Sequence, residues 1–532
     1  MARPKLPASV TLDLSLDEEG DVPRMRRAVA RKLRVDVESL PELVLLRRAI
    51  DARAGRVRFH VELGLGSARE NQAAKRPPQE VRSPERVVIV GDGPAGLFCA
   101  YELARQGIRC TVLDRGKSVQ PRRRDLKGLN QEGHVDGDSN YCFGEGGAGT
   151  YSDGKLYTRS DKRGDIRDVI DILALHGAPE AIRVDARPHI GSNKLPKVVS
   201  AMRASLEAVG VEFRFGARVD ALLTRDEGRR RRLAALRLAS GEEVAAEAFV
   251  IATGHSARDV FSMLDEAGAR LEAKSFALGV RIEHPQPLIN RIQYGAFAEH
   301  PKLKSASYRL AAHPSGQSVF SFCMCPGGWV VPASTEAGAL VVNGMSLSKR
   351  NSPFANSGMV VAVEIETLAR HGFKGPFAGI EVQRRIEEAA FAAGGGALRA
   401  PATRATDFVA KRASSQVSAT SYIPGLQASD IAQVLDSAGP DFSTPLREAL
   451  QEFGRRMRGY LSEEAMLIGV ETRTSCPLRV PRDPQSLESS DIADLYPCGE
   501  GAGYAGGIVS AALDGMAVAK SIATRFAAQS AR

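Results

Sequence analysis

The 532-residue sequence lacks any apolar stretch long enough to span a bilayer, and its start, Met-Ala-Arg-Pro-Lys-Leu-Pro, lacks the apolar segment of a signal peptide. It also lacks an internal repeat of fixed period. Its seven cysteines are scattered and odd in number, which argues against a full disulfide framework. We therefore expect a cytoplasmic protein without membrane spans.

The overall composition is that of an ordinary globular protein, but the glycines are unevenly distributed along the chain. Hydrophobic residues make up 43% and charged residues 25%, as in globular proteins, and the length is too great for a single core. The net charge of +9 favours anionic ligands and is equally compatible with nucleic acid. The 51 glycines cluster in particular loops, which is typical of nucleotide-binding turns.

The first 65 residues predict a small β-α-β-β domain. Apolar residues alternate from Val10 to Leu14 and again from Val57 to Leu63, as in half-buried strands. Between them, apolar positions from Met25 to Leu33 recur at helical spacing, and an apolar run follows at Leu43–Leu46. Residues 66–86 are polar, contain proline and show no periodicity, which predicts a linker.

A new pattern begins at Val87. The β-branched run Val87–Val90 leads into a turn of sequence Gly91-Asp92-Gly93-Pro94-Ala95-Gly96, and residues 94–106 are compatible with a helix that Gly107 ends. A second strand, Arg109–Leu113, is followed by Asp114. Strand, glycine turn, helix, strand and acid follow the order of the dinucleotide-binding fold.

Each glycine of this turn has a physical task. Gly91 permits the tight reversal, Gly93 lets the backbone approach a pyrophosphate, and Gly96 permits close packing of helix on sheet. Pro94 and Ala95 open a helix whose free N–H groups and positive dipole end attract phosphates. We predict that Asp114 accepts hydrogen bonds from ribose hydroxyls, with Arg115 next to it in the same cofactor site, and that Asp114 disfavours a 2′-phosphate.

Two later segments decide between FAD and NAD by resemblance. Val250-Ile-Ala-Thr253-Gly254 resembles the second signature of two-dinucleotide-binding-domain flavoproteins, and the Gly499-Glu500 end of residues 493–500 resembles their third. This resemblance implies bound FAD. It also implies an α/β fold with a discontinuous Rossmann-like FAD-binding domain, built from both ends of the chain, and an inserted α+β substrate domain.

Over nearly its whole length, the chain resembles a bacterial family of FAD-dependent, or NAD(FAD)-utilising, dehydrogenases. Five segments carry that resemblance: residues 47–53, 143–156, 187–193, 322–328 and 504–515. The resemblance implies that Gly146, Gly147 and Gly149 contact the cofactor through their backbone. It also implies that a helix beginning near Ile508, after Gly506 and Gly507, directs its N-terminus at the flavin ring.

Catalytic residues are harder to assign from the sequence. Asp153 and Lys155 follow the glycine-rich loop, and His189 lies in Arg-Pro-His-Ile-Gly, so each is a candidate, with a purely structural role as the alternative for each. Cys323 and Cys325 are either a redox pair or two small buried residues, and no partners stand nearby to complete a metal site. The absence of Cys-x-x-Cys beside the turn excludes a reaction of the glutathione-reductase type.

The middle of the chain mixes strand-like and helical stretches. We expect strands at Phe276–Ile282, Val319–Met324 and Gly338–Met345, and helices at Val361–Arg370 and Pro445–Leu461. Residues 211–254 predict a three-stranded meander. The expected division is a domain of residues 1–65, a linker of 66–86, FAD-binding parts at 87–270 and 466–532, and the inserted domain at 271–465.

The predicted function is an FAD-dependent oxidoreductase that transfers a hydride through flavin N5 to or from a small molecule, which the positive charge suggests is anionic. No second GxGxxG follows a mid-chain strand, so NAD(P)H, if used, binds transiently. One alternative is a flavin monooxygenase. Another is a nucleic-acid-associated flavoprotein that docks through the basic cluster of the first helix, namely Arg24, Arg26, Arg27, Arg31, Lys32 and Arg34.

Overall fold

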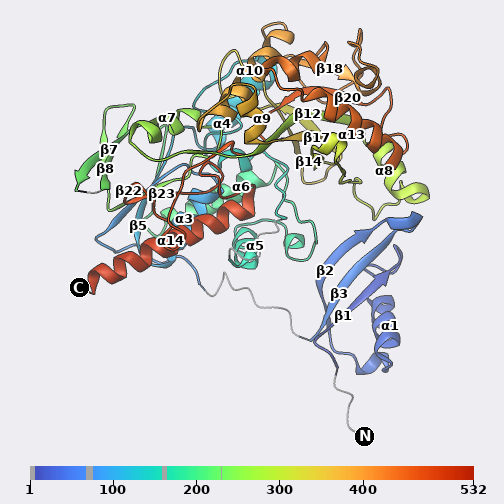
Figure 1. Ribbon diagram of the computed structural model, residues 1–532. Helices are drawn as coiled ribbons and strands as arrows, with labels where there is room; N and C mark the ends of the chain where they lie inside the picture. The colour runs from blue at the N-terminus through green and yellow to red at the C-terminus, as the bar shows by residue number, and fades with distance from the viewer. Residues whose placement is uncertain (1–5, 67–75, 158–163, 229, 532) are drawn as a thin grey trace.

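The computed structural model of the chain describes residues 6–66, 76–157, 164–228 and 230–531. The described chain forms a small N-terminal unit, a parallel sheet built from segments on both sides of an insertion, and a larger mixed sheet within that insertion (Figure 1). Most of the predicted linker, residues 67–75, lies outside the described residues.

The N-terminal unit has the predicted β-α-β-β order. Strands β1 (Ser9–Leu14), β2 (Leu43–Asp51) and β3 (Arg58–Leu65) form an antiparallel sheet in the order β1-β3-β2. Helix α1 (Val22–Leu33) begins at Asp21, whose side chain accepts from the Arg24 amide, and it buries Val29 and Ala30. The alternation of β1 is explained by burial of one face only.

The parallel sheet assembles both ends of the chain. Its strand order is β23-β10-β4-β5-β6, and every neighbouring pair is parallel; the strands are β4 (Arg86–Val90), β5 (Arg109–Asp114), β6 (Glu212–Phe215), β10 (Ala248–Ile251) and β23 (Leu495–Pro497). Helix α3 (Pro94–Arg105) follows β4, and α14 (Ile508–Ser530) follows β23. A Cβ at Gly515 of α14 would lie 2.0 Å from the Ala95 carbonyl oxygen, so glycine is required where these helices meet.

The predicted meander at 211–254 is divided differently. Its first segment splits at Gly216: β6 joins the parallel sheet, and the meander proper consists of β7 (Val219–Glu227), β8 (Arg230–Leu238) and β9 (Glu243–Ala245). Gly216 has φ +67, a conformation that side chains disfavour, and this lets the chain turn between the two sheets. The short strand β22 (Ile492–Ala493) pairs with β8.

The inserted unit is a seven-stranded sheet. Its order is β13-β14-β17-β12-β20-β18-β19, with strands β12 (Phe276–Pro285), β13 (Ala311–Ala312), β14 (Val319–Cys325), β17 (Phe354–Val363), β18 (Ala400–Arg404), β19 (Leu426–Ala428) and β20 (Met466–Glu471). Helices α10 (Ala378–Ala393) and α13 (Ser443–Arg456) contact this sheet. The predicted strand at Gly338–Met345 corresponds to β16 (Val342–Ser346), which pairs with β15 (Gly328–Pro332) outside it.

Two predictions for this unit need correction. The expected helix at Val361–Arg370 is wrong in its first part, because the β-branched end of β17 pairs with β12 and only α9 (Ile365–Arg370) is helical. The expected end of the insertion at 465 falls one strand early. Strand β20 pairs with both β12 and β18, so it belongs to the inserted sheet.

The N-terminal unit is tied to the rest of the protein through β2. The Arg48 amide donates to Val184 O at 2.7 Å and the Ala186 amide donates to Arg48 O at 2.8 Å. The Arg48 guanidinium also binds Asp185 at 2.7 Å. Within the basic cluster of α1, Arg26 donates to three backbone carbonyls of its own unit.

No helix among the described residues is long and apolar enough to cross a membrane.

Candidate functional site

The turn after β4 has the geometry that its glycines predict. Gly91 adopts φ +101, and a Cβ there would lie 2.5 Å from the Ala252 carbonyl oxygen. A Cβ at Gly96 would lie 1.9 Å from the Gly91 oxygen. Gly93 is different, because a Cβ there would meet only the Gly147 Cα, at 3.9 Å. Gly91 and Gly96 are therefore required by the fold, whereas Gly93 leaves open space in front of the turn.

Helix α3 begins at this open space. Its N-cap is Gly93, which makes no side-chain capping bond, and Pro94 and Ala95 form its first turn. Uncapped N–H groups and the positive end of the helix dipole suit an anionic group. Next to them, Asp92 is fully buried and its Oδ1 has no hydrogen-bond partner among the described residues. Burial, together with Asp114, raises the pKa of Asp92 well above its ordinary value.

Asp114 ties the turn to two neighbouring segments. Its Oδ2 accepts from the Asp92 amide at 3.0 Å, and its Oδ1 accepts from Gly116 at 2.8 Å and Gly144 at 3.0 Å. The carboxylate is buried and already fixes the backbone, so its role toward ribose stays a prediction. Arg115 is engaged as well: it pairs with Asp259 and stacks on the Phe143 ring.

The glycine-rich loop packs directly on the turn. A Cβ at Gly147 would lie 2.9 Å from the Gly93 Cα, and a Cβ at Gly149 would lie 3.4 Å from both Pro94 Cγ and Ile508 Cγ1. Gly146 and Gly147 both adopt positive φ, which lets the backbone curl at this point. The loop, the turn and the start of α14 are thus neighbours, although they are far apart in the sequence.

Sequence reasoning missed the residue that shapes this loop. Arg122, in α4 (Val119–Glu132), is completely buried. Its guanidinium donates to five backbone carbonyls at 2.8–3.1 Å, those of Asn140, Tyr141, Gly144, Glu145 and Gly147. Five donors in one planar fork hold the loop carbonyls inward. No sequence pattern identifies this residue, since it lies within a run of three arginines.

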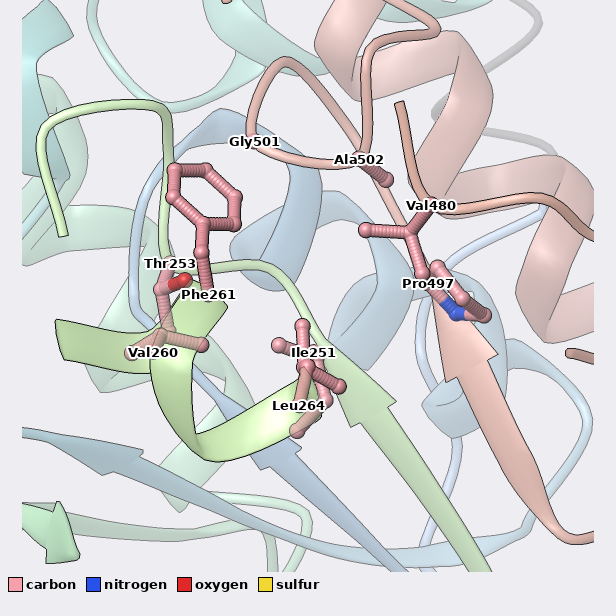
Figure 2. Close-up of a pocket in the computed structure, with 9 residues that line it drawn as sticks. All are labelled: Ile251, Thr253, Val260, Phe261, Leu264, Val480, Pro497, Gly501 and Ala502. Atoms are coloured by element: carbon pink, nitrogen blue, oxygen red, sulfur yellow. The ribbon is translucent and has the colours of Figure 1, made fainter. Parts of the chain in front are cut away.

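The second and third signature segments meet beside the turn. Figure 2 shows Ile251, Thr253 and helix α7 (Arg258–Glu266) on one side of a small apolar pocket, with the loop at Gly501 and Ala502 on the other. A Cβ at Gly501 would lie 2.6 Å from the Gly254 carbonyl oxygen. Gly254 itself has φ +72 and nothing within 4 Å of a Cβ position.

Gly499 and Glu500 follow β23. The Gly499 amide donates to Asp514 at 2.7 Å, and Asp514 is paired with Arg482 at 2.6 Å, so a buried ion pair fixes this segment. Burial raises the pKa of Glu500 to about 7, with Lys274 acting in the opposite direction and Cys323 in the same direction. Glu500 Oε1 lies 3.6 Å from His255 Nδ1.

The start of α14 is open in the same way as the start of α3. Its N-cap, Gly507, makes no side-chain capping bond, and neither Gly506 nor Gly507 has any atom within 4 Å of a Cβ position. Ile508, the first helical residue, lines a pocket together with Pro94, Gly146 and Gly149.

These observations fit an FAD site. Two uncapped helix N-termini and three open glycine positions, at Gly93, Gly254 and Gly507, surround the edge where the parallel strands end. In open parallel sheets, ligands bind at the carboxyl ends of the strands. The individual contacts with FAD stay predictions, but the fold brings the six segments predicted to make them to the same edge: residues 91–96, 114–115, 146–149, 253–254, 499–500 and 506–508.

A cluster of charged side chains lies where the glycine-rich loop meets the inserted sheet. Asp153 is 1% exposed and receives hydrogen bonds from Ser346 and, at 2.6 Å, from Arg350. Lys155 Nζ lies 3.1 Å from Asp153 Oδ2. Lys155 and Arg350 hold the pKa of Asp153 well below its ordinary value, and Asp153 raises the pKa of Lys155, both against the effect of burial.

The inserted sheet contributes a buried ion pair to the same cluster. Arg281 on β12 lies 2.6 Å from Glu471 on β20, and both side chains are almost completely buried. Arg281 also donates to the Asn343 and Asn356 side chains and to Cys323 O at 3.0 Å. The charge of Glu471 raises the pKa of Arg281 despite burial.

His189 does not suit proton transfer at neutral pH. Burial, reinforced by Arg350, lowers its pKa to about 4, so the ring is neutral near pH 7. Its Nε2 lies 3.2 Å from the Ser348 carbonyl oxygen, and its backbone pairs with that of Lys155. These contacts favour the structural alternative for His189.

The cysteines of β14 differ from the expected buried pair. Cys325 is fully buried, but Cys323 is exposed. Cys323 adopts φ +43, and the register of β14 against β17 shifts between Phe322 and Cys325. This bulge removes Cys323 from regular strand geometry. No group of three or more His, Cys, Asp or Glu residues suited to a metal occurs in the described parts of the chain.

Comparisons with known proteins agree with this architecture. Residues 275–474 match a family described as "FAD-dependent protein, C-terminal domain-like", residues 86–120 match "FAD dependent oxidoreductase", and residues 7–65 match a domain of unknown function. An uncharacterised protein of Clostridium beijerinckii is 39% identical over an alignment of 543 positions, gaps included, which covers 97% of this chain and 98% of that protein.

Solved flavoprotein structures share a much weaker likeness. A geranylgeranyl bacteriochlorophyll reductase-like protein from Thermoplasma acidophilum is 12% identical, with a TM-score of 0.36 and coverage of 84% of this chain and 79% of that one. CtdE in complex with FAD is 10% identical, with a TM-score of 0.32 and coverage of 84% and 90%. At these TM-scores the likeness carries no argument about the reaction.

The fold and site define an α/β flavoprotein whose cofactor is FAD. The chain belongs to the FAD-dependent oxidoreductase family, in the same family as the uncharacterised protein of Clostridium beijerinckii.

Proposed function

We propose that this protein is a dehydrogenase or reductase that exchanges a hydride with a small molecule bound between the glycine-rich loop and the inserted sheet. FAD supplies the chemistry of hydride exchange at its N5 atom. The observation that carries the proposal is the fixed cluster of Asp153, Lys155 and Arg350, because it joins the loop next to the cofactor site with the inserted unit, at the segment between β16 and β17.

Lys155 is the group that we assign to charge stabilisation. Its side chain is 32% exposed, so a substrate can reach it, while Asp153 holds its ammonium in place. The raised pKa keeps Lys155 positively charged throughout the neutral range. A fixed cation stabilises negative charge that develops during a reaction without the cost of reorientation.

Asp153 acts through Lys155. It accepts from Arg350 and Ser346 and is almost completely buried, so it has no open path to a substrate. Its low pKa keeps it ionised, which suits a positioning residue and argues against a proton donor. We therefore separate the two candidates: Lys155 faces the reacting molecule, and Asp153 orients Lys155.

The test is anaerobic rapid mixing of the FAD-bound protein with NADH and NADPH, followed by reoxidation with a panel of small quinones, enones and keto acids. The proposal predicts that flavin absorbance is bleached and then restored by at least one acceptor. Lys155→Met should slow hydride exchange by about a hundredfold with unchanged FAD content. The matched control, Lys411→Met at an exposed position, should leave the rate unchanged.

Two results would contradict the proposal. One is a flavin that neither NAD(P)H nor any acceptor reduces or reoxidises. The other is oxygen consumption by NAD(P)H that requires a third compound and inserts oxygen into it, which would indicate a monooxygenase.

A further inference from the structure

The Cys-Met-Cys segment at the end of β14 places two sulfurs around one ammonium group. Lys155 Nζ lies 3.5 Å from Cys323 Sγ and 3.4 Å from Cys325 Sγ. The positive φ of Cys323 and the register shift of β14 make this arrangement possible, because they take the exposed Cys323 out of the regular strand while Cys325 stays buried. One thiol is therefore exposed, and a second, buried thiol contacts the same ammonium group and donates to the Cys323 carbonyl oxygen at 3.3 Å.

The charges around the two sulfurs favour different protonation states. A hydrogen bond from the Cys325 thiol, with Lys155 and Arg281, holds the pKa of Cys323 well below its ordinary value. The loss of some water around the sulfur, which lies against Lys155 although the residue as a whole is exposed, and the charge of Asp153 act in the opposite direction. The same hydrogen bond, burial and the negative charges of Cys323 and Asp153 raise the pKa of Cys325, against Lys155. Burial raises the pKa of Glu471 and of Glu500 to about 7, and the negative charge of Cys323 acts in the same direction.

From this geometry we infer that Cys323 is a nucleophilic thiolate and Cys325 its resolving thiol, in a dithiol site that reduces low-molecular-weight disulfides by exchange. An accessible thiolate beside a lysine, with a second thiol in contact, meets the requirements for attack and for resolution. The site differs from the disulfide-reductase arrangement that the sequence excludes, because its cysteines lie on the inserted sheet and not beside the glycine turn.

The exchange balances in two steps. The Cys323 thiolate attacks one sulfur of the disulfide; the S–S bond breaks, a mixed disulfide forms, and the first thiolate leaves with the bonding electrons. Cys325 then loses its proton to the departing thiolate, and its sulfur attacks Cys323, which releases the second thiolate to take a proton from solvent. The dithiol is oxidised by two electrons and the substrate disulfide is reduced by two. External thiol restores the dithiol.

This inference is independent of the proposed hydride transfer, because the exchange needs no electron from the flavin. The two can therefore fail separately. A protein whose flavin accepts hydride from NAD(P)H but whose Cys323 is unreactive would retain the first proposal and lose the second, and the reverse result would do the opposite.

The experiment mixes reduced, desalted, FAD-bound protein with the aromatic disulfide dithiobis(nitrobenzoate) and follows the release of the coloured thiolate. A fast phase that releases two thiolates per chain is expected. Cys325→Ser should release only one in that phase and retain the adduct on Cys323, as read by peptide mass spectrometry. Cys323→Ser should abolish the fast phase, and Cys142→Ser, at the other partly exposed cysteine, should leave it unchanged.

The pH dependence tests the part played by Lys155. Lys155→Met should slow the fast phase about tenfold at pH 6, because one pKa unit changes the thiolate fraction tenfold, and the two proteins should converge near pH 9. Lys155→Arg should restore most of the rate, which a merely misfolded variant would not. A fast phase that persists in Cys323→Ser, two thiolates from Cys325→Ser, or the pH profile of an ordinary thiol in the wild type would each overturn the inference.

Discussion

The parallel sheet and the inserted sheet differ in the polar groups that surround their candidate sites. Around the parallel sheet, the edge that we predict to hold FAD is lined by backbone groups: open glycines, uncapped helix starts, and loops fixed by side chains such as Arg122 that donate to carbonyls. In the inserted sheet, charged side chains themselves are buried inside the strands, as with Arg281 and Glu471. We therefore predict that the parallel sheet binds its ligand mainly through peptide groups, and that the inserted sheet contributes side-chain charge.

This difference has a physical reason. A pyrophosphate is held well by several N–H groups and a helix dipole, which any sequence with suitable glycines can supply. Chemistry on a substrate needs a particular charge at a particular point, which must be shielded from water and supported by partners. Gly344 and Gly358 illustrate the support, because a Cβ at either would collide with the Arg281 or Glu471 side chain.

The largest effect is expected when one buried charge is removed from the inserted sheet. Glu471→Ala leaves the Arg281 guanidinium buried without its partner, so the free energy of unfolding should fall by about 3–5 kcal/mol. Chemical denaturation followed by circular dichroism measures it. The exposed control Glu463→Ala should change stability by less than about 0.5 kcal/mol. Equal effects for the two variants would show that the buried pair does not stabilise the sheet.

The backbone side of the comparison is tested at Arg122. In Arg122→Lys, at most three donors remain for five carbonyls, so the loop should lose stability by about 2–3 kcal/mol and FAD affinity should fall with it. Denaturation and FAD titration of the same preparation report both quantities. Arg124→Lys, at an exposed position two residues along α4, is the control. Unaltered FAD affinity in Arg122→Lys would show that the loop held by Arg122 does not contribute to FAD binding.

A substitution at Gly93 tests FAD binding without an expected effect on folding. A Cβ there meets no atom closer than 3.9 Å, so Gly93→Val should fold, but its side chain would fill the space in front of α3. FAD affinity should drop at least about tenfold, which corresponds to about 1.4 kcal/mol. Equilibrium titration with FAD measures this drop, with Gly128→Val in α4, where a Cβ has no neighbour within 4 Å, as the control. Normal flavin content in Gly93→Val would refute the assignment.

The smallest effect concerns a neutral group buried in the inserted sheet. His284 is completely buried, its Nε2 donates to Tyr460 O at 2.8 Å, and burial lowers its pKa to about 4. The unfolded chain takes up this proton below pH 6.5 and the folded chain does not, so stability is lost as pH falls. Between pH 7 and pH 5.5 the loss should be about 1 kcal/mol.

The comparison for this prediction is His284→Asn, which should lack that part of the pH dependence even if it is less stable at every pH. His134→Asn, at an exposed position, should keep the wild-type slope. Identical slopes for wild type and His284→Asn would show that His284 titrates normally in the folded protein.

The two sheets also differ in how far the sequence predicts them. The glycine turn, the helix after it and the small N-terminal unit follow from local spacing, and the structure has all three. The pattern of Val361–Arg370 predicts a helix, but the first residues of this segment form the end of β17, because they pair with the distant strand β12. The meander and the boundary at 465 were misjudged for the same reason, since sheet membership is decided by distant partners.

In the candidate site, too, local features were easier to predict from the sequence than contacts between distant residues. The glycine-rich segments predicted to hold the cofactor follow from local spacing, and the structure brings them to one edge of the parallel sheet, while their contacts with FAD stay predictions. Arg122 and Arg281 could not be predicted, because their roles depend on residues 18 to 190 positions away. Lys155 was a candidate from its position after the loop, but its contact with Cys323 and Cys325 arises only when the inserted sheet folds over that loop.

The most direct test of the account is the amount of FAD that the purified protein releases on denaturation. The arrangement of two open helix starts and the glycine-rich loop predicts one FAD per chain in the wild type. Protein that is depleted of flavin should take up added FAD to the same ratio. A colourless protein that fails to bind added FAD, while its circular dichroism shows a folded chain, would contradict the central claim.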